Sequence, residues 1–258
     1  SPGTLPFTCR RSSTLMMITG GFARGGSLSS AMTGAGTGGG GQPVRNGRRP
    51  RGGLPLALAI GASTGGPRAL LILLADLQLP VPAPIFLVQH IHPKFTRILS
   101  RRLGEVSSLP VLEAEEAAVV QPGRIYIAPG GRHLVVERGV GGTCRTRLTV
   151  DPPRHGVRPS VDELFTSVAE AFGPRAVGVV LTGMGRDGLA GARAIKARGG
   201  TVLAEAEETC VVYGMPRALA EADLADRVVP IGEMAEAIRQ VCLGLTAGTA
   251  SVLLPMSE

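Results

Sequence analysis

The sequence contains no tryptophan, and its aromatic side chains are limited to two tyrosines and six phenylalanines. A chain of 258 residues that is 44% apolar is still long enough to bury a sizeable core. Leu, Val, Ile and Ala must therefore supply most of that core. Such a composition is typical of a parallel sheet covered by helices.

Paired cysteines and long apolar runs are also missing. The four cysteines form no C-x-x-C pair, and no histidine stands at metal-ligand spacing from them: Cys9, Cys144, Cys210 and Cys242. We therefore expect free thiols in a reducing, cytoplasmic compartment. No stretch approaches the roughly 18 uninterrupted apolar residues of a membrane span, so no membrane insertion is expected.

Acidic residues are absent from positions 1–53, which hold seven arginines and 14 of the 37 glycines. This leaves 20 of the 27 basic and all 20 acidic residues in 54–258. The net charge of +7 thus belongs to the first segment, and we expect no nucleic-acid binding from the folded part. Residues 1–53 are predicted to be a disordered Gly/Arg-rich tail, although a transit peptide or an anion-binding arm is also compatible.

From residue 54 to 245 buried apolar runs alternate with stretches of helical period. Strands are predicted at 56–60, 85–89, 176–181, 201–204 and 227–229, and helices at 67–77, 95–103, 161–172, 189–198 and 232–243. This alternation predicts one catalytic domain of α/β class, a doubly wound and mostly parallel sheet with helices on both faces. Residues 246–258 are predicted to be a C-terminal tail.

Two local patterns add detail to this prediction. Short alternating runs at 124–128 and 133–137, joined by Pro129-Gly130-Gly131, predict a small antiparallel hairpin that a run at 147–150 extends. Ser160 and Glu163 have the spacing of a capping box at the start of a helix.

Three polar residues follow three of the predicted strands. Ser63 comes after the first strand, His90 after the second, and Asp187 after the third. Because parallel sheets bind ligands at the carboxyl ends of their strands, the three side chains are expected at one edge. A serine hydroxyl becomes a good nucleophile when a histidine takes its proton and a carboxylate orients that histidine. The pattern therefore predicts a serine esterase.

Each residue also has a simpler interpretation. The turn Gly61-Ala62-Ser63-Thr64-Gly65-Gly66 resembles a nucleophile elbow, but such turns also cradle phosphates or only reverse the chain. His90 is compatible with an ordinary hydrogen-bonded histidine, and His92 competes with it as a base. Asp187 before Gly188 is compatible with a helix N-cap.

Chain order excludes some enzyme classes. An α/β-hydrolase places its acid before its histidine, whereas His90 here precedes Asp187. The turn at 61–66 lacks the G-x-G-x-x-G spacing of a dinucleotide site, and no Walker lysine follows it.

Seven segments resemble the catalytic domain of the bacterial chemotaxis protein-glutamate methylesterases (CheB type). In chain order they are IGASTGGP (60–67), VQHI (88–91), FT (95–96), IYIAPGG (125–131), RPSVDELF (158–165), LTGMGRDG (181–188) and VYGMP (212–216). The resemblance implies Ser63 as nucleophile, His90 as general base and Asp187 as orienting acid. It also implies a metal-free, cofactor-free hydrolase that releases methanol from glutamyl methyl esters on chemoreceptor helices and often deamidates receptor glutamines.

The oxyanion formed by serine attack needs hydrogen-bond donors, and glycine-rich backbone can approach it closely. Thr64 and Gly65 in the turn, and Gly183 and Met184 after the third strand, are the candidates. Thr64 is also compatible with a helix cap and Met184 with a packing residue. Tyr213 and Met215 are candidates for the cleft wall or for a buried turn.

Two alternative functions remain at this stage. One is a serine esterase or amidase that acts on another substrate. Members of this family typically carry a receiver domain of about one hundred residues. Residues 1–53 are too short to form one, which is compatible with a different pathway. The other is a receptor-binding module without catalysis.

Overall fold

A computed structural model describes residues 56–80 and 82–251 of the chain. The tail predicted at 1–53 and residues 252–258 lie outside the described residues. Seven parallel strands form one sheet in the order β3-β4-β2-β1-β7-β8-β9. The strands are β1 (Ala57–Ala62), β2 (Ile85–Gln89), β3 (Val111–Glu113), β4 (Ile125–Ile127), β7 (Ala176–Val180), β8 (Thr201–Glu205) and β9 (Arg227–Val229).

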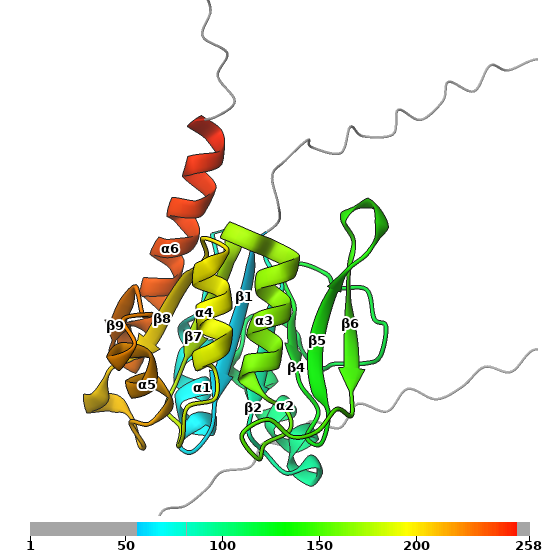
Figure 1. Ribbon diagram of the computed structural model, residues 1–258, viewed down its shortest axis with the longest axis vertical. Coiled ribbons are helices and arrows are strands. Elements are labelled where there is room, and N and C mark those ends of the chain that lie inside the picture. The colour runs from blue at the N-terminus through cyan, green and yellow to red at the C-terminus, as the bar shows by residue number, and fades with distance from the viewer. Residues whose placement is uncertain (1–55, 81, 252–258) are drawn as a thin grey trace, which may run out of the picture. The chain divides into compact units, whose positions relative to one another are not determined.

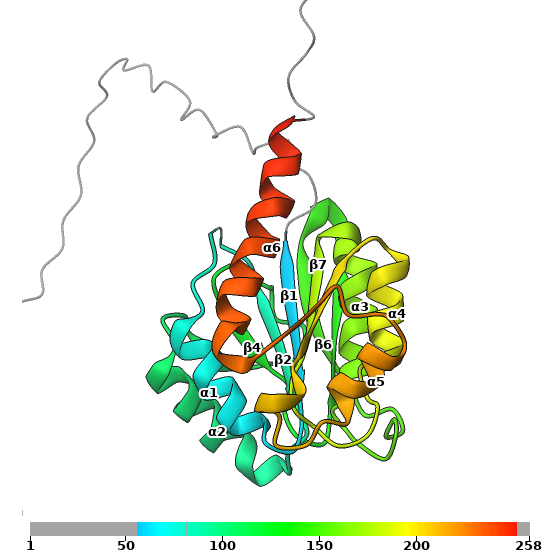
Figure 2. The same cartoon turned by 90° about the vertical axis from the view of Figure 1, so that its left-hand side faces the viewer.

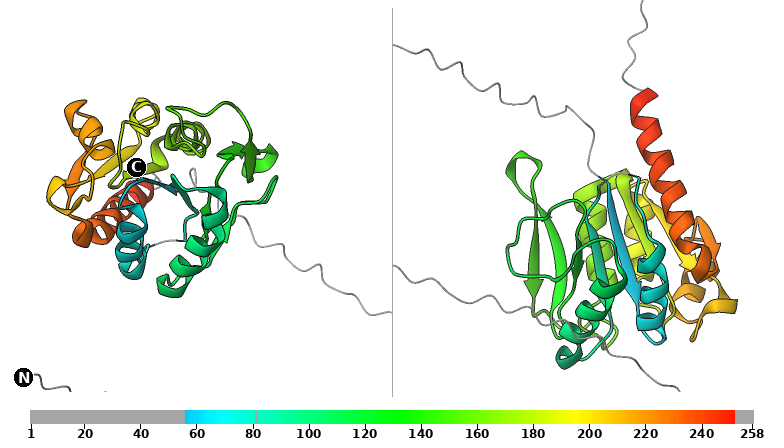
Figure 3. Two further views of the ribbon diagram at one scale, coloured as in Figure 1. Left: turned by 90° about the horizontal axis from the view of Figure 1, so that it is seen from below. Right: turned by 180° about the vertical axis from the view of Figure 1, so that it is seen from behind.

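Helices cover both faces of this sheet (Figures 1 and 2). They are α1 (Gly66–Asp76), α2 (Pro93–Val106), α3 (Val161–Phe172), α4 (Leu189–Ala197), α5 (Met215–Glu221) and α6 (Ile231–Ser251), with short 3-10 turns at Val140–Gly142, Gly173–Arg175 and Glu207–Thr209. On one face α1, α2 and α6 pack over a core that includes Leu70, Leu103 and Ile238 (Figure 3, right). On the other face α3, α4 and α5 enclose a second core around Phe165 and Ile195.

The chain reverses its direction of progress across the sheet beside β1. From β1 it moves to β2 and the strands beyond, then returns to β7 on the other side of β1. Open parallel sheets bind ligands at such a switch point, outside the carboxyl ends of the strands. The doubly wound, mostly parallel fold predicted from the sequence is therefore confirmed.

The hairpin prediction was wrong in its first strand. The run at 125–127 forms β4, which lies in the parallel sheet between β2 and β3 with all three residues buried. The antiparallel pair consists instead of β5 (His133–Arg138) and β6 (Cys144–Thr149). Burial on both faces, which an edge hairpin cannot provide, explains why the apolar Ile125–Ile127 run joins the sheet.

The last helix is longer than predicted. α6 continues to Ser251, eight residues past the predicted end at 243. No proline interrupts the chain before Pro255, and the Thr246 hydroxyl donates to the Leu243 carbonyl at 2.8 Å. Within the described ranges, no helix combines the length and apolar character required to cross a membrane.

Candidate active site

Ser63 follows β1 in a tight turn that leads into α1. Its N–H donates to the Thr182 carbonyl at 3.0 Å, and its own carbonyl accepts the Gly66 N–H at 2.8 Å. Gly65 has φ of +84°, a left-handed conformation that glycine adopts without strain. The turn thus holds a half-buried serine at the carboxyl edge, between β2 and β7.

His90 and Asp187 meet at the same edge. His90 Nε2 lies 2.7 Å from Asp187 Oδ2, and the two side chains are 10% and 2% exposed. Because Nε2 carries the proton shared with the carboxylate, Nδ1 is the nitrogen that remains to accept a proton from a nucleophile. Within 56–80 and 82–251, no hydrogen bond joins the Ser63 hydroxyl to His90. Contacts of this kind often tighten only when substrate binds.

Asp187 accepts four hydrogen bonds in all. Oδ2 also accepts the Val161 N–H at 2.7 Å, while Oδ1 accepts the Ser160 hydroxyl at 2.8 Å and the Asp162 N–H at 3.0 Å. Burial alone would raise the pKa of Asp187, but the bonds from His90 and from these three donors outweigh it and lower the pKa. The carboxylate is therefore ionised at neutral pH and fixed in orientation.

These bonds correct the capping-box prediction. Ser160 occupies the N-cap position of α3, but its side chain makes no cap bond to that helix and donates to Asp187 instead. Asp187 is the residue that caps α3, through the N–H groups of Val161 and Asp162. Glu163 pairs with Arg154 at 2.7 Å.

Asp162 in turn caps α4, a role that sequence reasoning missed. This buried carboxylate accepts the N–H groups of Gly188 and Gly191 at 2.9 and 2.8 Å, at the start of α4. The loop that carries Asp187 and the start of α3 therefore cap each other's helices. Asp162 Oδ2 contacts His155 Nε2 at 3.0 Å and Arg154 Nε at 3.3 Å.

Gln89 is a second residue that sequence reasoning passed over. It is 2% exposed, and its Nε2 donates to the Ser63 carbonyl at 2.8 Å and the His90 carbonyl at 3.1 Å. One amide group thus links the backbone of the nucleophile to that of the base. A polar residue that ends an otherwise apolar strand just before His90 was the available signal.

Comparisons with known proteins identify the family of this chain. A family model described as "CheB methylesterase" matches residues 58–238.

The chain belongs to the CheB methylesterase family.

Curated relatives named "Protein-glutamate methylesterase/protein-glutamine glutaminase" come from several organisms. The one from Moorella thermoacetica is 48% identical over 77% of this chain and 46% of its own length. The one from Geobacillus kaustophilus is 48% identical over 71% of this chain and 53% of its own. The chain therefore spans about half the length of these relatives.

A solved structure shares the fold as well. The crystal structure of the Thermotoga maritima CheB methylesterase catalytic domain matches with a TM-score of 0.70 and 42% identity, over 72% of this chain and 98% of that one. The family resemblance expected from the seven sequence segments is confirmed.

The candidate oxyanion donors of this CheB family site differ in availability. The Gly183 N–H is already donated to the Val212 carbonyl at 3.0 Å. Among the residues that the structure describes, the N–H groups of Thr64, Gly65 and Met184 have no protein acceptor. The Met184 side chain is 75% exposed, so its alternative interpretation as a packing residue was wrong.

Because Gly183 has no side chain, Ser63 and Met215 can instead pack closely against its backbone. A Cβ atom there would lie 2.7 Å from Ser63 Cβ and 2.4 Å from Met215 Sδ. Met215 is fully buried, so its side chain packs behind Gly183 and not on an open cleft wall. Tyr213 is half-buried and bridges to Gly183 through its backbone.

One group of side chains has the spacing of a metal site among the described residues. Ligand atoms of His155, Asp162 and Asp187 lie within 4.8 Å of one another. The carboxylates already accept backbone N–H and side-chain donors, so binding a cation there would compete with both helix caps.

Proposed function

We propose that this chain hydrolyses γ-glutamyl methyl esters on chemoreceptor helices in the cytoplasm, with Ser63 as nucleophile, His90 as general base and Asp187 as the acid that orients His90. The observation that carries the proposal is the 2.7 Å contact between His90 and Asp187, at the edge of the sheet where Ser63 follows β1 in a fold of the CheB family. The free thiols of Cys144, Cys210 and Cys242 favour a reducing compartment.

The first half of the reaction transfers the acyl group to the enzyme. Ser63 Oγ attacks the ester carbonyl carbon while its proton passes to His90 Nδ1, which leaves a tetrahedral oxyanion. The unpaired N–H groups of Thr64, Gly65 and Met184 are the candidate donors to that oxyanion. The intermediate then expels the methoxy group, which takes the proton from His90 and leaves as methanol.

The second half regenerates the serine. Water attacks the glutamyl ester of Ser63, and His90 accepts a proton from the water and returns it to Ser63 Oγ. The product is a glutamate carboxylate, with one proton released to solvent. Asp187 stabilises the imidazolium in both halves because it is an ionised group in direct contact with the ring.

Deamidation of receptor glutamines is a second proposed reaction of the same site. The relatives bear a glutaminase in their names, and an amide differs from the ester only in its leaving group. The same steps would release ammonia in place of methanol.

The test is methanol release from receptor membranes that carry labelled methyl esters. Ser63→Ala should abolish release, whereas Ser108→Ala, which changes an exposed serine elsewhere, should leave it unchanged. Equal release by wild type and Ser63→Ala would refute the proposal. Hydrolysis of small esters without receptor demethylation would indicate a different ester or amide substrate, and receptor binding without any turnover would indicate a binding module.

A further inference from the structure

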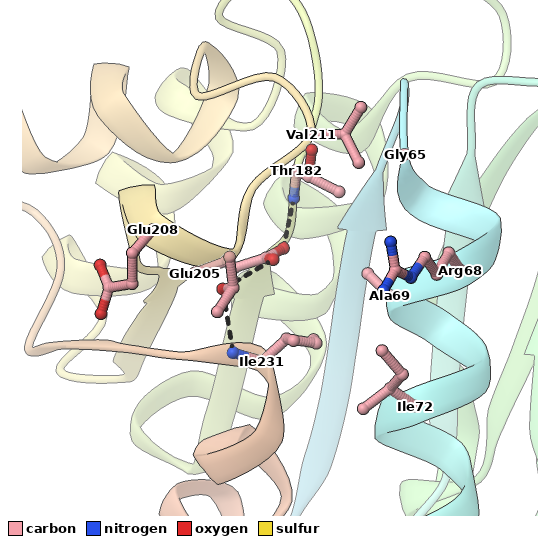
Figure 4. Close-up of a pocket in the computed structure, with 10 residues that line it drawn as sticks. Gly65, Arg68, Ala69, Ile72, Thr182, Glu205, Glu208, Val211 and Ile231 are labelled. Carbon is pink, nitrogen blue, oxygen red and sulfur yellow. Dashed lines mark hydrogen bonds between the residues drawn. The ribbon is translucent and has the colours of Figure 1, made fainter.

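Glu205 is a buried carboxylate that the proposed reaction does not use. It ends β8 and is 0% exposed. Its Oε2 accepts the Thr182 N–H at 2.8 Å, and its Oε1 accepts the Thr209 hydroxyl at 3.0 Å. Figure 4 shows the carboxylate beneath Thr182, beside a cavity of about 300 Å³.

Thr182 connects Glu205 to the turn of the nucleophile. The Thr182 carbonyl accepts the Ser63 N–H at 3.0 Å, and its hydroxyl donates to the Thr64 carbonyl at 2.9 Å. Thr182 thus holds the peptide unit that precedes Ser63 and the one that follows Thr64. Glu205 holds the N–H of this same residue, two hydrogen bonds away from Ser63.

The far side of Glu205 is anchored too. The Thr209 hydroxyl, which donates to Glu205, accepts the Ile231 N–H at 3.1 Å, and Ile231 is the first residue of α6. Glu205 therefore lies between the start of α6 and Thr182. Hydrogen bonds at both ends fix its position.

Burial of this carboxylate is unfavourable in itself. Desolvation raises the pKa of Glu205, and the bonds from Thr182, Thr209 and Cys210 only partly oppose that shift. An apolar side chain at this position would avoid the desolvation but would leave the Thr182 N–H without its acceptor. Buried polar groups are seldom left unpaired, so the Thr182 N–H requires an acceptor at position 205.

We propose that Glu205 is a positioning residue for the nucleophile, because its carboxyl oxygen holds Thr182 and thereby the backbone on both sides of Ser63. The inference rests on the proposed role of Ser63 as nucleophile. Glu205 is needed for its acceptor oxygen and not for its charge, because the Thr182 N–H and the Thr209 hydroxyl that it accepts are both neutral groups.

The substitution Glu205→Gln should therefore preserve the positioning role. Its carbonyl oxygen can accept the Thr182 N–H, and its amide can donate to the Thr209 hydroxyl. That hydroxyl can in turn donate to the Ala206 carbonyl, which lies 3.3 Å from it.

The test compares Glu205→Gln and Glu205→Ala by receptor demethylation and by the rate at which a fluorophosphonate labels Ser63. Glu205→Gln should retain both rates within about twofold. Glu205→Ala should lower kcat and the labelling rate about 10- to 100-fold, with KM within about twofold, which corresponds to loss of one buried acceptor. The acid limb of the pH–rate profile should coincide in wild type and Glu205→Gln.

Asp226→Ala is the matched control. Asp226 Oδ2 accepts the Val202 N–H at 2.8 Å near the opposite end of β8, so its loss should destabilise the fold without slowing the labelling of Ser63. Urea unfolding of each variant establishes that the folded protein is assayed.

Two outcomes would overturn the inference: wild-type labelling in folded Glu205→Ala, or a loss in Glu205→Gln as large as that in Glu205→Ala. Labelling reports on Ser63 whatever the substrate. If wild type is labelled but demethylates no receptor, the proposed function fails and the role of Glu205 is still decided. If Ser63 of wild type resists labelling, both proposals fail.

Discussion

Asp187→Asn is the most informative single substitution, because it keeps the shape of the side chain and removes its charge. The asparagine has one acceptor oxygen for the four donors that Asp187 now satisfies. Its amide nitrogen must replace either Oδ1 or Oδ2. The two orientations have different consequences for the fold and for catalysis.

An amide nitrogen at the Oδ2 position would oppose two donors, Val161 N–H and His90 Nε2–H. At the Oδ1 position it would oppose only the Asp162 N–H, because the Ser160 hydroxyl can turn to accept it. The second orientation is therefore favoured. It keeps the His90 proton on Nε2 and leaves one buried N–H unpaired, which costs about 1–3 kcal/mol of unfolding free energy.

The loss of activity follows from the same orientation. Since the tautomer of His90 is retained, only the charge that stabilises the imidazolium is lost. A hydrogen bond to a charged group contributes about 1.5–3 kcal/mol, so kcat should fall about 10- to 200-fold. Inversion of the tautomer would cost about ten-thousand-fold, as in a serine protease.

The assay is methanol release at saturating substrate, with urea unfolding in parallel and Asp226→Asn as control. The stability difference between wild type and Asp187→Asn should depend on pH in the acid range. It should shrink as the pH falls below the ordinary pKa of 3.8 and through the lowered pKa of Asp187, because protonation removes the advantage of the carboxylate. Unchanged activity, or a ten-thousand-fold loss, would refute the reasoning.

Three further predictions concern the surroundings of Ser63. Gly183→Ala should lower kcat at least tenfold and destabilise the fold by about 1–3 kcal/mol, because its Cβ would overlap the neighbouring side chains; Gly244→Ala, where a Cβ meets nothing within 4 Å, should leave kcat unchanged. Gln89→Leu should lower the fluorophosphonate labelling rate of Ser63 several-fold, and a wild-type rate in the folded variant would exclude Gln89 as a link between nucleophile and base. Burial raises the pKa of Cys210 to about 12 and that of Cys242 to about 11, so mass spectrometry should find neither thiol alkylated by iodoacetamide at pH 8 unless the protein is unfolded; rapid alkylation of either in the folded protein would contradict this.

The sequence predicts those parts of the fold that depend on local patterns. The bounds of β2 and β9 match the prediction, because a buried apolar run between turn residues is a local signal. The side chains after β1, β2 and β7 share one edge because parallel strands share a direction. His90 and Asp187 are brought together as predicted, whereas the bond between Ser63 and His90 stays a prediction.

What sequence reasoning missed depends on contacts between distant segments. The run at 125–127 has several compatible partners, and only the space between β2 and β3 decides among them. The hydrogen bonds of Asp187 to Ser160 and Val161 join positions that are 27 and 26 residues apart. Glu205 only follows the strand predicted at 201–204, and its importance depends on Thr182, 23 residues earlier.

The exchange of caps between Asp162 and Asp187 bears on how this family can lose its activity. A chain that has lost its serine or its histidine keeps both helices capped, since neither residue takes part in the caps, and it should remain folded. In a chain that has lost Asp187, the N–H groups of Val161 and Asp162 at the start of α3 both lose their acceptor. Inactive members of the family should therefore be recognisable by an intact aspartate beside a replaced serine or histidine, and the reverse pattern should be rare.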